Sequence, residues 1–179
     1  MKIIEQYIPV DHPNRPARKL EALKAVVIHY TQNDAPGMTD TKNVRWIGRR
    51  YIRNQNGIFE SDGKTKFLYG SAHVFCDMNS ATLAIPADEA AWACGDRHLN
   101  GGQQKAAKIV FDNRQNYRSI SVEICNNDVI QNSDEDWNAA VSNAKQWVID
   151  FLKSKNLRVD LEDSLNPQEL VSAPESGNI

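Results

Sequence analysis

The sequence predicts an α/β domain with a central mixed β-sheet and helices on its faces. Three observations favour this class: a β-branched apolar run at 25–30, a hairpin-like pair of strands near residue 80, and a long amphipathic stretch near residue 140. The expected order is strand, helix, hairpin, strand, helix. The 179 residues fit a single domain, 1–179, and a domain of this size buries roughly 70% of its unfolded surface.

Composition excludes several classes of partner. The net charge of −2 gives no electrostatic reason to expect nucleic acid or an anionic membrane. No apolar run is long enough to cross a bilayer, and the N-terminus has no signal-peptide core, so we expect synthesis in the cytoplasm without Sec export. The three cysteines form no C-x-x-C motif, and Cys76 and Cys125 are expected to be buried free thiols.

The first elements are an arm and a strand. Three prolines among polar residues predict that residues 1–24 form an extended arm over the body of the domain. The run at 25–30 then predicts a strand buried on both faces, with His29 at its end. Such a histidine is either a core residue with both nitrogens bonded or a ligand at the rim of the sheet, where α/β folds bind metals and small molecules.

A helix and a hairpin follow. Thr39 is a suitable N-cap for a helix over about 40–54, and residues 54–70 are expected to form a loop with a short strand at 66–69. Residues 71–77 and 81–86 predict two strands joined by a turn. The expected apolar face of the helix consists of Val44, Ile47 and Tyr51.

The last elements are a strand and the longest helix. A polar connection runs to about residue 118, and residues 119–125 predict another strand. Ser133 and Asp136 match a capping box, which predicts a helix beginning there. The apolar stripe of this helix contains Trp137, Ala140, Val141, Ala144, Val148, Phe151 and Leu152.

Glu123 is the most informative polar residue. Strand alternation places Glu123 on the same face as Ser119 and Ser121, opposite Ile120, Val122 and Ile124. That face is either solvated, or it lines a pocket in which the carboxylate acts as general base toward a metal-activated water.

The histidines differ in context. His73 follows two small residues and is either a structural histidine that supports the site through a hydrogen bond or a ligand. His12 and His98 are expected to be ordinary surface residues. No G-x-S-x-G, P-loop or H-E-x-x-H pattern is present, which argues against those hydrolase and nucleotide-binding classes.

Four motifs together resemble the zinc-dependent N-acetylmuramoyl-L-alanine amidases of phage endolysins, bacterial autolysins and peptidoglycan-recognition proteins. They occur in the order of the family, and the resemblance covers about residues 3–155. The arm from Tyr7 to Pro16 also resembles that of Gram-positive phage and autolysin members. The matching segments are V-V-I-H-Y-T at 26–31 with Asn33, S-A-H-V at 71–74, A-W-A-C-G-D at 91–96, and S-I-S-V-E-I-C at 119–125.

The resemblance implies the fold of these amidases and hydrolysis of the amide between N-acetylmuramic acid and the L-alanine of the stem peptide. It makes His29 the first zinc ligand, and Glu123 the residue that takes a proton from the zinc-bound water. It implies substrate contacts for His73, Trp92 and Asp96, with peptidoglycan as the partner. The implied role is that of a phage or prophage endolysin or an autolysin, acting on the cell wall after release.

The chain departs from the family in its metal ligands. A catalytic zinc needs two more protein donors, which in the family are a later histidine and then a cysteine or aspartate. No histidine follows His98, and the sequence ends at Ile179, about where the ligand-bearing strand should begin. Three explanations stay open: a truncated chain lacking that strand and loop, a member that has lost zinc and only binds peptidoglycan, or recruitment of His73, Cys94 or Asp96.

Truncation has two expected consequences. One imidazole cannot hold zinc, so binding would be weak or absent, and an open sheet edge would favour self-association. A different alternative is a metal-free hydrolase that uses Glu123 and His73.

Overall fold

The computed structural model describes residues 1–31, 37–49, 51–53, 55–56, 59–61, 70–94, 114–125 and 134–157. Its main sheet has the strand order β1-β6-β5-β7-β2. Only β5 and β6 pair antiparallel; the other neighbours are parallel, so the predicted mixed sheet is confirmed. The strands are β1 (Lys2–Glu5), β2 (Ala25–Tyr30), β5 (Val74–Cys76), β6 (Ser80–Leu83) and β7 (Ser119–Ile124).

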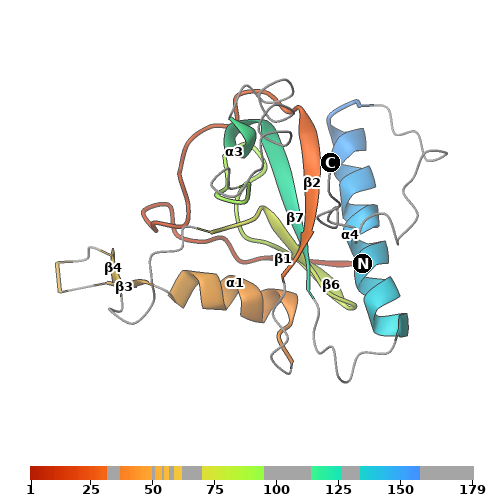
Figure 1. Ribbon diagram of the computed structural model, residues 1–179, viewed down its shortest axis with the longest axis horizontal. Coiled ribbons are helices and arrows are strands. Elements are labelled where there is room, and N and C mark those ends of the chain that lie inside the picture. The colour runs from red at the N-terminus through yellow and green to blue at the C-terminus, as the bar shows by residue number, and fades with distance from the viewer. Residues whose placement is uncertain are drawn as a thin grey trace, which may run out of the picture.

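Helices cover both faces of this sheet. The longest, α4 (Asp134–Ser154), lies along one face (Figure 1) and packs through Ala140, Val141 and Ala144 against Val122 and Ile124 of β7. On the other face α1 (Asp40–Arg49) buries Val44 and Ile47 against a second core cluster that includes Phe75 of β5. The predicted apolar stripe of α4 and the alternation of β7 are therefore confirmed. No helix in the described part of the chain is long and apolar enough to cross a membrane.

The region after α1 differs from the prediction. The helix expected over 40–54 ends at Arg49, and two short antiparallel strands follow, β3 (Tyr51–Arg53) and β4 (Phe59–Ser61). Gly48 has a low helix propensity, and the aromatic and β-branched residues after it favour extended backbone. The strand expected at 66–69 lies outside the described residues.

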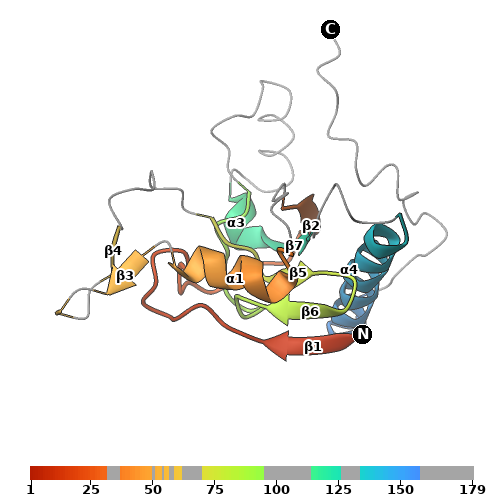
Figure 2. The same cartoon turned by 90° about the horizontal axis from the view of Figure 1, so that it is seen from below.

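The N-terminal arm, residues 1–24, is built into the fold. Its first residues form β1, which lies beside β6 at the edge of the sheet (Figure 2). Further along, His12 and Asn14 are 1% and 0% exposed, and the Asn14 side-chain amide donates to the Ile47 carbonyl at 3.1 Å. The expectation that His12 is a surface residue was therefore wrong, because the arm folds this side chain into the interior.

A buried polar cluster fixes the start of α1. Thr39 Oγ1 accepts from the Lys42 amide at 3.4 Å, which confirms the predicted N-cap. The carboxyl of Asp40 accepts from the hydroxyls of Ser80 and Thr82 at 2.9 and 2.7 Å, and burial raises its pKa. These hydrogen bonds join the first turn of α1 to β6 of the main sheet.

Two of the three cysteines behave as expected. Cys76 and Cys125 are buried free thiols, and the Cys125 sulfur accepts from the Asn43 side-chain amide at 3.4 Å. Burial raises the pKa of both thiols, so they act as small core residues rather than nucleophiles.

Candidate functional site

The sheet brings His29 and Glu123 together. They are register partners on neighbouring parallel strands, β2 and β7, and register partners in a sheet project to the same face. On the opposite face Val122 and Ile124 pack against α4. Glu123 therefore faces away from the α4 core, on the side that the sequence alternation predicted, and an imidazole stands next to it.

Partial burial changes the protonation of both groups. Desolvation raises the pKa of Glu123 from 4.5 to about 7, and it lowers the pKa of His29. A neutral imidazole is the form that binds metals. A carboxyl group that titrates near neutrality suits general acid–base catalysis at physiological pH. His29 is therefore in the form that can bind a metal, and Glu123 is able to take up and release a proton near neutral pH.

Cys94 lies beside His29. Its Sγ atom is 4.0 Å from His29 Nε2 and 3.8 Å from Ser119 Oγ, and burial raises the pKa of the thiol. Asn116 holds this segment: its side-chain oxygen accepts from the backbone amides of Ala93 and Cys94 at 3.0 and 2.7 Å. Asn116 was missed at the sequence level, because it lies in a long polar stretch that gives no local signal. It belongs to α3 (Gln115–Arg118), a short helix that was not predicted.

Trp92 is fixed next to this segment. Its indole nitrogen donates to the Pro13 carbonyl at 3.2 Å, and its ring stands edge-on to Tyr117 with centroids 6.2 Å apart. Backbone Trp92 exchanges hydrogen bonds with Ser71 on the approach to β5. The side chain remains half-buried, so part of it stays accessible to a ligand. Asp96, the third residue implied for substrate contact, lies outside the described residues.

His73 is fully engaged inside the protein. It is 1% exposed, and its Nε2 donates to the Glu89 carbonyl at 2.9 Å. Because a carbonyl only accepts, Nδ1 carries no proton and accepts from the Ser121 amide at 3.0 Å and from the Ser121 hydroxyl at 3.1 Å. This arrangement favours a structural role for His73, and we do not propose that it contacts the substrate.

Burial of His73 predicts a pH-dependent stability. Desolvation lowers its pKa from 6.5 to about 4, so between these values the unfolded chain binds more protons than the folded chain. Stability is fully present above the unfolded pKa and falls as the pH drops toward 4. We expect the free energy of unfolding to lose about 2 kcal/mol between about pH 7 and about pH 5 from this group alone.

Urea unfolding of the wild type and of His73→Asn at both pH values measures this contribution. The variant starts less stable because it loses buried hydrogen bonds of the imidazole, but its stability should change less with pH. An equal pH dependence in the two proteins would show that His73 does not titrate in this window.

The described residues do not complete a zinc site by themselves. Across these ranges, no three histidine, cysteine, aspartate or glutamate side chains lie close enough together to hold a metal ion. His29 and Cys94 are two neighbouring residues of kinds that bind zinc, whereas a catalytic zinc takes three protein donors. Of the donors considered for recruitment, His73 is ruled out because both of its ring nitrogens are bonded within the protein.

A sheet face that pairs a neutral imidazole with a carboxyl of near-neutral pKa has the parts of a hydrolytic site. Comparison with known proteins identifies which family of hydrolases the chain belongs to. The N-acetylmuramoyl-L-alanine amidase family matches residues 19–166, and the chain belongs to this family, whose members typically use zinc.

Individual relatives agree with the family. The chain is 33% identical over 122 residues to the N-acetylmuramoyl-L-alanine amidase BlyA of Bacillus subtilis, covering 66% of this chain and 28% of BlyA. It is 29% identical over 154 residues to the amidase CwlH of the same species, covering 86% and 47%. The chain thus spans less than half the length of these curated relatives.

A solved structure supports the fold. The catalytic domain of XlyA superposes with a TM-score of 0.57 at 26% identity, covering 88% of this chain and 80% of that domain. The predicted amidase-like architecture, with a mixed sheet between helices, is confirmed.

Proposed function

We propose that this chain is the hydrolytic domain of a peptidoglycan amidase, which cleaves the amide between N-acetylmuramic acid and the L-alanine of the stem peptide. The observation that carries the proposal is the register pairing of His29 with Glu123 on one face of the sheet. Family membership over residues 19–166 supplies the substrate class. The proposed setting is lysis or remodelling of a bacterial cell wall, as in an endolysin or autolysin.

In this proposal Glu123 is the acid–base residue. Its carboxylate takes a proton from the attacking water and returns a proton to the leaving amine, and a pKa of about 7 suits both transfers. His29 occupies a zinc-ligand position, and zinc, when bound, would polarise the scissile carbonyl and acidify a water. Trp92, held at the edge of the site by Pro13 and Tyr117, offers a flat apolar surface for the substrate.

The direct test is digestion of purified cell walls by the full chain. Zinc is supplied in excess, because the described residues provide no complete ligand set. We expect free amino termini to appear without new reducing sugars, since an amidase leaves the glycan strand intact. A lysozyme-type sugar hydrolase would instead release reducing ends, and that result would contradict the proposal.

The same assay separates the enzyme from a binding module. The absence of three clustered ligand side chains among the described residues favours the non-catalytic alternative as the second candidate. A binding module would sediment with the walls and release no amino termini at any zinc concentration. Sedimentation and amine release measured on one sample distinguish the two candidates.

A further inference from the structure

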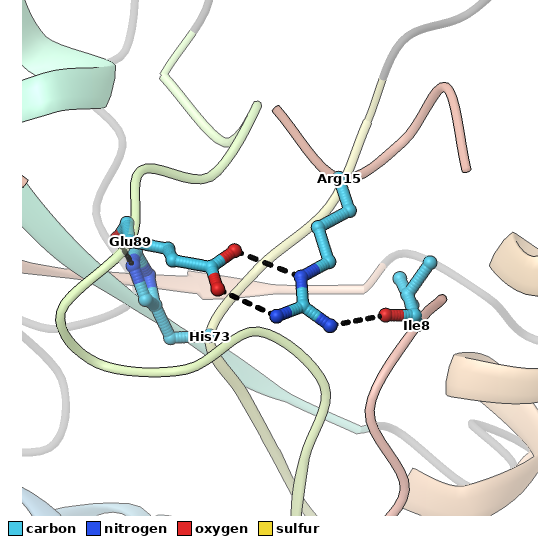
Figure 3. A network of polar contacts seen from close by, with 4 residues as sticks. All are labelled: Ile8, Arg15, His73 and Glu89. Carbon is cyan, nitrogen blue, oxygen red and sulfur yellow. Dashed lines mark hydrogen bonds and ion pairs between the residues drawn. The ribbon is translucent and has the colours of Figure 1, made fainter. Parts of the chain in front are cut away.

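An ion pair ties the N-terminal arm to the body of the domain. The Arg15 guanidinium donates from Nε and Nη2 to the two carboxylate oxygens of Glu89 at 2.8 and 2.5 Å. Its remaining nitrogen, Nη1, donates to the Ile8 carbonyl at 2.7 Å (Figure 3). The side chains of Arg15 and Glu89 are only 13% and 19% exposed. Bidentate geometry and shielding from solvent make this pair more directional than an ordinary surface ion pair.

The arm also holds the backbone around Glu89. The Ala90 amide donates to the Arg18 carbonyl at 2.7 Å, the Leu20 amide donates to the Asp88 carbonyl at 2.7 Å, and Lys19 forms a β-bridge with Glu89. The position of the Glu89 carbonyl is therefore set by contacts with the arm on both its side chain and its backbone.

That carbonyl is the partner of His73. It accepts from His73 Nε2, as Figure 3 shows beside the ion pair. The other ring nitrogen accepts twice from Ser121, and the His73 amide donates to the Ser121 carbonyl at 3.0 Å. Ser121 precedes Glu123 by two residues on the same face of β7. A continuous series of contacts thus leads from the arm to the strand that carries the proposed acid–base residue.

We propose that Arg15 is a positioning residue for this site: through Glu89 and His73 it fixes the section of β7 that presents Glu123. The inference rests on the proposed function, because it assigns Arg15 a part in the same reaction without contact to the substrate. Small displacements matter here, because a shift of about 1 Å in a reacting group can cost about 100-fold in rate.

The kinetic test compares Arg15→Ala with a matched variant, Phe151→Leu. Phe151 is 8% exposed and stacks on Trp147 near the C-terminal end of α4, and it does not belong to the cluster that packs on β7, so its truncation lowers stability without touching the series of contacts. We expect Arg15→Ala to lower kcat for amine release by about 10-fold with KM unchanged, and Phe151→Leu to change neither. Equal loss of kcat in both variants would overturn the proposal, because stability alone would then explain the effect.

A double-variant cycle tests the route through Glu89. Arg15→Ala and Glu89→Gln remove the same ion pair, so the double variant should be no slower than Arg15→Ala alone. Additive losses would show that Arg15 acts by another path, and they would contradict this assignment.

A second readout does not depend on activity. Hydrogen exchange of the Ser121 amide, which donates to His73 Nδ1, reports the far end of the series directly. We expect faster exchange at Ser121 in Arg15→Ala, by about 10-fold, and no change in Phe151→Leu. Unchanged Ser121 exchange in Arg15→Ala would overturn the inference even if the enzyme is active. An inactive wild type with the expected exchange pattern would instead count against the proposed function and leave the coupling demonstrated.

Discussion

Replacing Glu123 by glutamine is expected to lower the rate of amine release from cell walls by about 10²- to 10⁴-fold, the usual contribution of a positioned general base. Glutamine keeps the size of the side chain and its place opposite His29, but it cannot take a proton from water. Because the Glu123 carboxyl is partly desolvated, a neutral amide is also tolerated there, and the variant should fold at least as well as the wild type.

The matched control is Glu135→Gln, which makes the same chemical change at an exposed position in the first turn of α4. It should hydrolyse walls at the wild-type rate. If Glu123→Gln retained full activity while remaining folded, Glu123 would not be the acid–base residue.

Replacing His29 by alanine is expected to abolish the response of the reaction to zinc. Loss of a residue that merely supports a metal ligand costs 10- to 100-fold in affinity or activity, so loss of a ligand should exceed about 100-fold. Zinc binding to the full chain, measured by competition with a colorimetric chelator, gives the answer without a substrate. The wild type is expected to bind weakly, since the described residues hold no three-ligand group, and the variant should bind still more weakly.

Cys94→Ser is the variant to compare with His29→Ala, because the Cys94 sulfur lies 4.0 Å from His29 Nε2. A cysteine binds zinc only as the thiolate, and burial raises the pKa of the Cys94 thiol, so we expect Cys94→Ser to bind zinc as the wild type does. An equal loss of zinc affinity in Cys94→Ser and His29→Ala would show that Cys94 is a zinc ligand. Wild-type zinc binding in His29→Ala would contradict the metal-ligand assignment.

Much of the fold could be predicted from local sequence pattern. The β-branched run at 25–30 and the alternating run at 119–125 formed strands, and the apolar stripe of α4 covered the sheet as expected. The expectation that the strand at 25–30 is buried on both faces was wrong, because among the described residues β2 is an edge strand of the main sheet and its residues are only half-buried or exposed. The end of α1 was misplaced because the periodic pattern continues past Gly48 while the backbone turns to strand. The short strand β1 was missed because it is stabilised by pairing with β6, about 80 residues away, and such partners are not visible in a local window.

The site was only partly predictable for the same reason. Alternation indicated the face of Glu123, and its place in an apolar strand marked it as unusual. That His29 stands opposite Glu123 depends on the register between β2 and β7, which a single sequence does not encode locally. The engagement of both His73 nitrogens and the contact of Arg15 with Glu89 likewise arise from residues far apart in the chain.

Mass spectrometry of the soluble products from wall digestion is the most direct test of the central claim. The full chain with excess zinc is expected to release stem peptides whose new amino terminus is L-alanine, together with glycan whose muramic acid carries a free lactyl carboxylate. Glu123→Gln should release neither product above background. Peptides cut within the stem, or products that form equally with wild type and Glu123→Gln, would contradict the assignment of this site as a muramoyl–L-alanine amidase.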